Sequence, residues 1–109
     1  MADEVLLALA EAIAARRHAS GEVSYTRKLL DAGVAKCARK FGEEAVETVI
    51  AALDEDSDAL KGEAADTIYH LLVLLEARGI ALAEVLEVLE SRMGQSGLAE
   101  KAARSRPQR

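Results

Sequence analysis

The sequence has 109 residues, which is enough for one domain with a single hydrophobic core. Half of the residues are hydrophobic, only 3% are aromatic, and the one proline is Pro107, so no proline breaks a helix over the first hundred residues. This composition predicts an all-α fold. The net charge of −5 argues against a nucleic-acid-binding protein, because such a protein usually carries a basic face.

Several features of the sequence indicate a cytoplasmic protein. The longest apolar run, 71–75, is too short to cross a membrane, so no membrane association is expected. The N-terminus has acids at Asp3 and Glu4 and no long apolar run, which predicts that there is no signal peptide. The single cysteine, Cys37, cannot form an intramolecular disulfide, and free thiols are typical of the cytosol.

Apolar residues recur at helical spacing along most of the chain. Successive helices are expected at 3–19, 27–32, 34–53, 57–78 and 81–92. Ser24 or Thr26 is the expected cap of the second helix, and Asp56 or Ser57 that of the fourth. The last helix is expected to face inward with Leu82, Val85, Leu86 and Leu89. We therefore expect a single all-α domain over 1–92, followed by a basic, mobile tail over 93–109.

The fourth expected helix is apolar on almost every side from 64 to 75. A helix that is apolar all round is normally buried all round. A chain of this size can hardly surround one helix by itself, so we expect this segment to lie in an oligomer interface. The simplest arrangement is a symmetric homodimer whose two copies complete the helical bundle.

Two pairs of acids stand out on the third and fourth expected helices, Glu44 with Glu47 and Glu63 with Asp66. Each pair has the i, i+3 spacing that places two side chains on one face of a helix. Because the connection is short, the two helices should pack antiparallel, and their acidic faces can meet. Repulsion among these carboxylates would be relieved by a hard divalent cation, for which Mg²⁺ is the first choice and Mn²⁺ a substitute. The lack of histidine and cysteine ligands argues against zinc.

Mg²⁺ that is held by carboxylates usually meets phosphates. Lys36 and Lys40 lie one turn apart next to the acids, where they could hold phosphate oxygens, and Lys28 could add to them. Glu43 faces slightly away from the other acids and could orient a water molecule. The alternative is a solvated helix surface, on which Lys40 and Glu44 form an ordinary i, i+4 pair.

The second acid pair decides between these interpretations. Glu63 and Asp66 begin an otherwise apolar helix, and the one nearby basic residue, Lys61, points elsewhere. Ionised acids in such a place need a partner. His70 lies one turn beyond Asp66, either as a hydrogen-bonded residue near the core or as a support for a metal ligand. The second acid pair therefore favours a site over a solvated surface.

The paired motif resembles that of the MazG-like all-α nucleoside triphosphate pyrophosphohydrolases, and more closely the phosphoribosyl-ATP pyrophosphohydrolase family of histidine biosynthesis. The resemblance rests on four segments: Ser24-Tyr25-Thr26-x-Lys28-Leu29-Leu30, Lys40-x-Gly42-Glu43-Glu44-x-x-Glu47, Glu63-x-x-Asp66-x-x-Tyr69-His70, and Ser96-Gly97-Leu98-x-Glu100-Lys101-Ala102. It implies Mg²⁺-dependent hydrolysis of the α–β phosphoanhydride of 1-(5-phosphoribosyl)-ATP, which gives the AMP derivative and pyrophosphate.

The resemblance also implies roles for individual residues. The metal ligands would be Glu44, Glu47, Glu63 and Asp66, with Glu43 as an auxiliary acid. The substrate and phosphate contacts would be Tyr25, Thr26, Lys28, Lys36 and Lys40. Two other functions remain open: a house-cleaning pyrophosphohydrolase of nucleoside or deoxynucleoside triphosphates with the same metal site, and a non-catalytic helical dimerisation module whose acids are only solvated.

Overall fold

The computed structural model describes residues 2–18 and 24–94, and this part of the chain contains helices and turns but no strand. Its helices are α1 (Ala2–Arg17), α2 (Tyr25–Ala32), α3 (Val34–Asp54), α4 (Ser57–Ala77) and α5 (Leu82–Met93). The all-α prediction is therefore confirmed. Of the predicted tail, all residues from 95 onward lie outside the described residues, as does the Ser96–Ala102 segment of the resemblance.

Local capping sets the helix boundaries. The Ser24 hydroxyl accepts a hydrogen bond from the Arg27 amide at 3.0 Å, so α2 begins at Tyr25, two residues earlier than expected. Asp56 accepts a hydrogen bond from the Ala59 amide at 2.9 Å and caps α4 in the same way. Gly33 separates α2 from α3 with a φ of 100°, a conformation that glycine adopts more readily than other residues.

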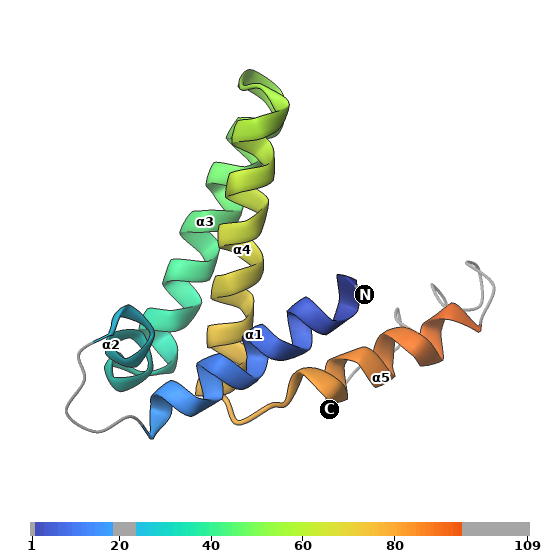
Figure 1. Cartoon of the computed structure of the whole chain (residues 1–109). Helices are drawn as coiled ribbons and strands as arrows, with labels where there is room; N and C mark the ends of the chain where they lie inside the picture. Colours follow the sequence, from blue (N-terminus) through green and yellow to red (C-terminus); the bar gives the residue numbers. More distant parts are fainter. Residues whose placement is uncertain (1, 19–23, 95–109) are drawn as a thin grey trace, which may run out of the picture.

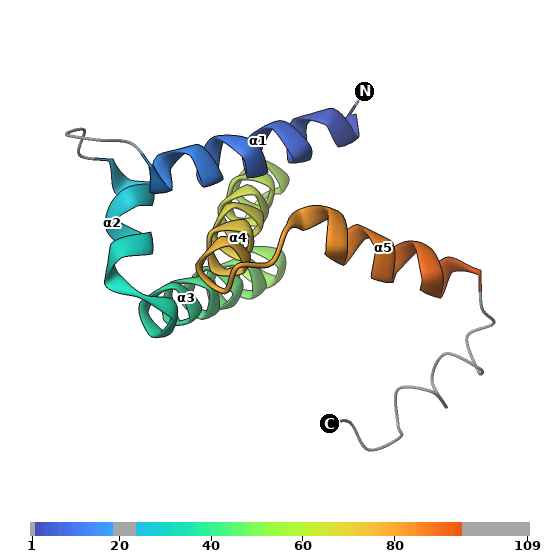
Figure 2. The ribbon, with the colours of Figure 1, turned by 90° about the horizontal axis from the view of Figure 1, so that it is seen from below.

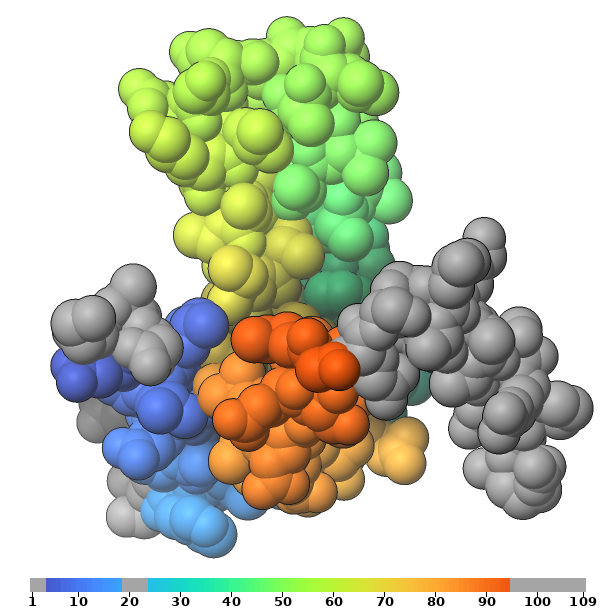
Figure 3. Space-filling view, turned by 90° about the vertical axis from the view of Figure 1, so that its right-hand side faces the viewer, coloured from blue at the N-terminus to red at the C-terminus, as the bar shows by residue number. Residues whose placement is uncertain are grey.

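An antiparallel hairpin of α3 and α4 is the centre of the molecule (Figure 1). One half of this hairpin stands clear of the other helices, as the space-filling view also shows (Figure 3). The other half packs against α1 and α2. There the buried core brings together one or two side chains from each of these four helices: Ile13, Leu29, Cys37, Leu72 and Val73. The packed half therefore anchors a hairpin whose remaining half is accessible.

An arginine at the end of α1 fastens that helix to the end of α4. The Nε atom of Arg17 lies 2.7 Å from the Glu76 carboxylate, and its Nη2 atom donates to the Glu76 carbonyl oxygen at 2.5 Å. Seen from below, α1 and α5 extend on the same side of the hairpin (Figure 2). The contacts of Arg17 with Glu76 fix the direction in which α1 leaves the core.

The last helix is less buried than its sequence pattern suggests. No residue of α5 is buried within this chain, and Leu86 and Leu89 of its expected inner face are 37% and 50% exposed. The prediction that these leucines face inward is wrong for the single chain. Leu82, which packs against the core, and Val85 are half-buried, so the described chain covers the apolar face of α5 only at its start.

The second half of α4 is also only partly covered. Leu72 and Val73 are buried, whereas Ile68 and Leu71 are exposed. On α3, four large apolar residues of the free half of the hairpin are exposed as well: Val46, Val49, Ile50 and Leu53. The described chain thus leaves an apolar surface on its central hairpin. The expected homodimer stays a prediction.

None of the helices in the two described ranges has both the length and the apolarity that a membrane span requires.

Candidate metal and phosphate site

Three of the predicted metal ligands come together on the α3–α4 hairpin. Carboxylate oxygens of Glu44, from α3, and of Glu63 and Asp66, from α4, all lie within 4.8 Å of one another. The antiparallel packing accounts for this, because it sets the i, i+3 pair of α4 opposite the acids of α3. Within the described residues, these three side chains offer oxygen ligands at a spacing that a single cation could bridge. We refer to them as the acid group.

Glu63 is the most perturbed member of the acid group. Burial raises its pKa, and the carboxylates of Glu47, Asp66 and Glu44 raise it further, together with a hydrogen bond to Glu47 that favours the protonated form. Its Oε1 atom is buried and has no hydrogen-bond partner. A buried acceptor without a donor, surrounded by other negative charges, is an unfavourable arrangement in the protein alone. A bound cation would supply the missing partner for this oxygen.

Glu47 lies beside the acid group rather than inside it. Its side chain is exposed, and its oxygens do not complete the set that lies within 4.8 Å. Its charge nevertheless acts directly on Glu63, second only to burial among the causes that raise the pKa of that residue. The structure therefore places three of the four predicted ligands together and the fourth next to one of them.

Lys40 and Glu43 form an ion pair at the edge of this region. The Lys40 Nζ atom lies 3.3 Å from a Glu43 oxygen, and this hydrogen bond, more than any other cause, raises the pKa of Lys40. The i, i+4 pair with Glu44, which the alternative of a solvated surface implied, is absent among the ion pairs of the described residues, since Glu44 lies with the acids of α4. Lys61 pairs with Asp58 at 3.9 Å and so points away from the acids, as predicted.

The other predicted phosphate contacts are less closely tied to the acid group. Lys28 on α2 and Lys36 in the first turn of α3 are both exposed. Thr26 is buried, and its hydroxyl forms a 2.5 Å hydrogen bond with the Tyr69 hydroxyl of α4. The structure therefore gives Thr26 a partner inside the protein, in a contact that joins α2 to α4.

A small aromatic cluster surrounds that contact. The ring of Tyr25 stacks on Tyr69 with a centroid distance of 6.3 Å, and His70 meets both rings edge-on at 5.9 and 4.9 Å. Tyr25 is half exposed, whereas His70 is buried, has no partner for its Nδ1 atom and has a pKa lowered by burial. The cluster therefore presents the Tyr25 ring to solvent and keeps an imidazole neutral beneath it.

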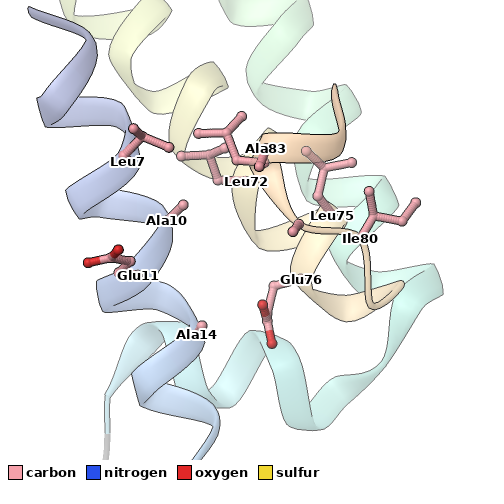
Figure 4. A pocket seen from close by; sticks show the side chains of 11 residues that line it. Leu7, Ala10, Glu11, Ala14, Leu72, Leu75, Glu76, Ile80 and Ala83 are labelled. Atoms are coloured by element: carbon pink, nitrogen blue, oxygen red, sulfur yellow. The ribbon is translucent and has the colours of Figure 1, made fainter. Parts of the chain in front are cut away.

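A hollow on the described chain lies away from the acid group. A cavity of about 270 Å³ opens between α1, the end of α4 and the start of α5 (Figure 4). Its walls are mainly alanine, leucine and isoleucine side chains, and the acidic side chains on it are Glu11 and Glu76. No member of the acid group lines it. Its apolar lining and its two carboxylates make it a poor site for a phosphate.

Two threonines next to the acid motifs were not predicted as site residues. Thr48 and Thr67 each directly follow an acid pair, and their hydroxyls lie 2.7 Å apart between α3 and α4. The signal that could have found them is the repeated order of acid, two small or apolar residues, acid and threonine.

Comparisons with known proteins show the family to which the chain is similar. A family model described as phosphoribosyl-ATP pyrophosphohydrolase matches residues 6–93. The protein named phosphoribosyl-ATP pyrophosphatase 1 in Bradyrhizobium diazoefficiens is 62% identical over 96 residues, which cover 88% of this chain and 91% of that protein.

Two further relatives extend this similarity over nearly the whole chain. A phosphoribosyl-ATP pyrophosphatase of Cereibacter sphaeroides is 55% identical over 100 residues, or 92% of this chain and 97% of its own length. The protein named phosphoribosyl-ATP pyrophosphatase 1 in Rhodopseudomonas palustris is 53% identical over 106 residues, or 97% and 99% of the two chains. The similarity thus includes both acid motifs.

Proposed function

The chain belongs to the phosphoribosyl-ATP pyrophosphohydrolase family, and from this membership we propose that it hydrolyses the α–β phosphoanhydride of 1-(5-phosphoribosyl)-ATP. The products are 1-(5-phosphoribosyl)-AMP and pyrophosphate, and the reaction is the second step of histidine biosynthesis. The observation that carries this proposal is the acid group, in which carboxylates from two helices lie within 4.8 Å of one another.

We propose Mg²⁺ as the cofactor, with Mn²⁺ able to substitute. The residues fit a hard cation, because the donors are carboxylate oxygens and one of them, Oε1 of Glu63, is buried without a hydrogen-bond donor. Glu44, Glu63 and Asp66 would hold the metal, and Glu47 would join them from its place beside Glu63. When bound, Mg²⁺ would neutralise phosphoanhydride oxygens and lower the pKa of a water molecule.

The neighbouring polar residues would act on the substrate. Lys40 already lies at the edge of the acid group, where its ammonium could exchange Glu43 for a phosphate oxygen. Glu43 would then be free to accept a proton from, or orient, a water molecule. Lys28 and Lys36 are exposed and would reach the substrate from solvent. The half-exposed ring of Tyr25, with Thr26 fixing its neighbour Tyr69, would form a further substrate contact.

We also propose that the protein is a cytoplasmic homodimer. The exposed apolar residues of α3 support an interface on the hairpin, where Val49 is 56% and Leu53 is 78% exposed. Large apolar patches of this kind usually mark a surface that is covered by a partner. The free, buried thiol of Cys37 suits a reducing compartment. Sedimentation equilibrium of the wild type and of Leu53→Glu tests the dimer, which the charged side chain should dissociate.

The enzymatic proposal is tested by two matched asparagine variants on α4. Asp66→Asn removes one carboxylate of the acid group, whereas Asp58→Asn removes an exposed carboxylate that pairs with Lys61 in the first turn. With phosphoribosyl-ATP and Mg²⁺, Asp66→Asn should lose nearly all pyrophosphate release and Asp58→Asn should keep it. Equal activity of the two variants would show that the acid group is only a solvated surface, as in a non-catalytic helical module.

A further inference from the structure

Two threonine hydroxyls connect α3 to α4 beside the backbone of the acid group. The Oγ1 atoms of Thr48 and Thr67 lie 2.7 Å apart, and both residues are half-buried. The Thr48 hydroxyl lies 3.0 Å from the carbonyl oxygens of both Glu44 and Glu63. The Thr67 hydroxyl lies 3.0 Å from the carbonyl oxygen of Glu44. The two carbonyls that these hydroxyls approach therefore belong to residues of the acid group.

The sequence repeats the same order of residues on both helices. Glu44-Ala-Val-Glu47-Thr48 lies on α3 and Glu63-Ala-Ala-Asp66-Thr67 on α4. Each threonine stands four residues after the first acid of its motif. Antiparallel packing then sets the two motifs against each other, so that the threonines meet in the seam between the helices.

The contacts cross from one helix to the other. Thr67 of α4 reaches the carbonyl of Glu44 on α3, and Thr48 of α3 reaches the carbonyl of Glu63 on α4. Each hydroxyl has one hydrogen to donate, so two of the four short contacts can be hydrogen bonds at any moment. For example, the Thr48 hydroxyl can donate to the Thr67 hydroxyl while the Thr67 hydroxyl donates to the Glu44 carbonyl oxygen. In every such arrangement, the backbone of the acid group is tied to the opposite helix.

We propose that Thr48 and Thr67 are positioning residues that hold Glu44 at a fixed distance from Glu63 and Asp66. This inference rests on the proposed function of the acid group as a metal site. Carboxylates that lie within 4.8 Å repel one another and push the two helices apart. The hydroxyl contacts between the helices oppose this separation, because they hold the backbone carbonyls of Glu44 and Glu63. They keep the carboxylates at the spacing that a cation needs, so that less ordering is required on binding.

Valine and serine variants test the proposal with Mn²⁺ alone as the probe. Thr48→Val and Thr67→Val keep the branched shape and remove the hydroxyl, whereas Thr48→Ser and Thr67→Ser keep the hydroxyl. Free Mn²⁺ measured by electron paramagnetic resonance gives the metal affinity without any turnover. Groups that support metal ligands typically contribute about 10- to 100-fold in affinity, so each valine variant should bind Mn²⁺ at least about tenfold more weakly. The serine variants should bind it nearly as the wild type does.

A control variant separates positioning from general stability. Ala51 is fully buried on α3 and offers no polar side chain, so Ala51→Gly destabilises the helix and leaves the hydroxyls in place. It should melt at a lower temperature and bind Mn²⁺ with unchanged affinity. Each single valine variant leaves the other threonine hydroxyl without its hydroxyl partner, whereas the double variant Thr48→Val/Thr67→Val removes both hydroxyls. The double variant should therefore be more stable than the sum of the two single changes predicts. Its Mn²⁺ affinity should nevertheless stay low.

Two results would overturn the proposal: valine variants that bind Mn²⁺ as tightly as the wild type, or a double variant that regains metal affinity together with stability. In the first case the hydroxyls do not position the acids, and in the second they serve only to stabilise the helix pair. Mn²⁺ binding by the wild type without hydrolysis of phosphoribosyl-ATP would count against the proposed function alone, because the affinities of the variants would still decide the role of the threonines.

Discussion

Replacing Glu63 by glutamine should change the stability of the protein in opposite directions with and without a divalent metal. Glutamine keeps the size of the side chain and removes its charge. In the metal-free protein, burial and the neighbouring carboxylates raise the pKa of Glu63 above its ordinary value of 4.5. An acid whose pKa is higher in the native than in the unfolded state binds more protons when folded. The native state therefore loses stability as the pH rises from 4.5 through the raised pKa.

Because the glutamine variant has no such titration, it should melt at a higher temperature than the wild type at pH 7 without metal. The difference should shrink as the pH is lowered toward 4.5, where Glu63 is increasingly protonated in both states. The comparison needs a chelator and a fixed protein concentration, since the melting temperature of a dimer depends on concentration.

Saturating metal should reverse the order. At a Mg²⁺ concentration of one hundred times Kd, mass action stabilises a native protein by about 2.7 kcal/mol. With an unfolding entropy of about 2.1 cal/mol/K per residue over 109 residues, this corresponds to a rise of about 12 °C in the melting temperature of the wild type. The glutamine variant lacks one ligand and should gain little.

Differential scanning calorimetry of both proteins, in chelator and in Mg²⁺, measures all four melting temperatures. The reasoning would be refuted if the wild type were the more stable protein in chelator, because the acid group would then not be repulsive. It would also be refuted if Mg²⁺ raised both melting temperatures equally, because Glu63 would then take no part in metal binding.

Three further predictions concern the core, the phosphate contacts and the thiol. Val73 is fully buried, so Val73→Ala should destabilise the protein by about 2 kcal/mol. This value comes from two methyl groups at about 0.8 kcal/mol each and a cavity term. The melting temperature should fall by about 9 °C, and the Mn²⁺ affinity should not change. Lys40→Met should lower kcat/KM for phosphoribosyl-ATP about 10- to 100-fold, because one charged hydrogen bond is lost. Lys36→Met, at an exposed position, is the comparison and should have a smaller effect on kcat/KM. Cys37 is buried, its thiol donates to the Leu29 carbonyl oxygen, and burial raises the pKa of the thiol. A disulfide reagent should therefore modify Cys37 far more slowly in the native protein than in denaturant. Equal rates of modification would contradict its place in the core.

The acid group could be predicted because its causes are local. Helical periodicity fixes which acids share a face, and a connection of two residues between α3 and α4 forces the helices to pack antiparallel. From these two facts, the approach of Glu44 to Glu63 and Asp66 follows without knowledge of the remaining chain. The family resemblance based on the same acids is confirmed by the family match.

Contacts between distant parts of the chain could not be predicted in this way. Thr26 was expected to touch substrate, but its hydroxyl meets Tyr69, a residue 43 positions later in the sequence. The spacing allowed Lys40 to pair with Glu44 on a solvated surface, but Lys40 pairs with Glu43, and Glu44 lies in the acid group with residues of α4. In both cases, the choice among possible partners depends on a neighbouring helix that the local pattern does not describe.

Apolar patterns likewise predict a face but not what covers it. The spacing of leucines on α5 indicates an apolar side, and the structure has one, yet Leu86 and Leu89 are exposed within this chain. The same holds for Leu53 at the end of α3. Whether a surface is buried by the same chain or by a second copy depends on the dimensions of the packed fold, which become visible only with all helices in place.

The most direct test of the account is the release of pyrophosphate by the purified protein in Mg²⁺, with phosphoribosyl-ATP compared against a panel of ordinary and deoxy nucleoside triphosphates. We predict a strong preference for phosphoribosyl-ATP, and activity that is lost on chelation and restored by Mg²⁺ or Mn²⁺. Equal or faster hydrolysis of the panel would contradict a role in histidine biosynthesis and indicate a house-cleaning pyrophosphohydrolase with the same acid group.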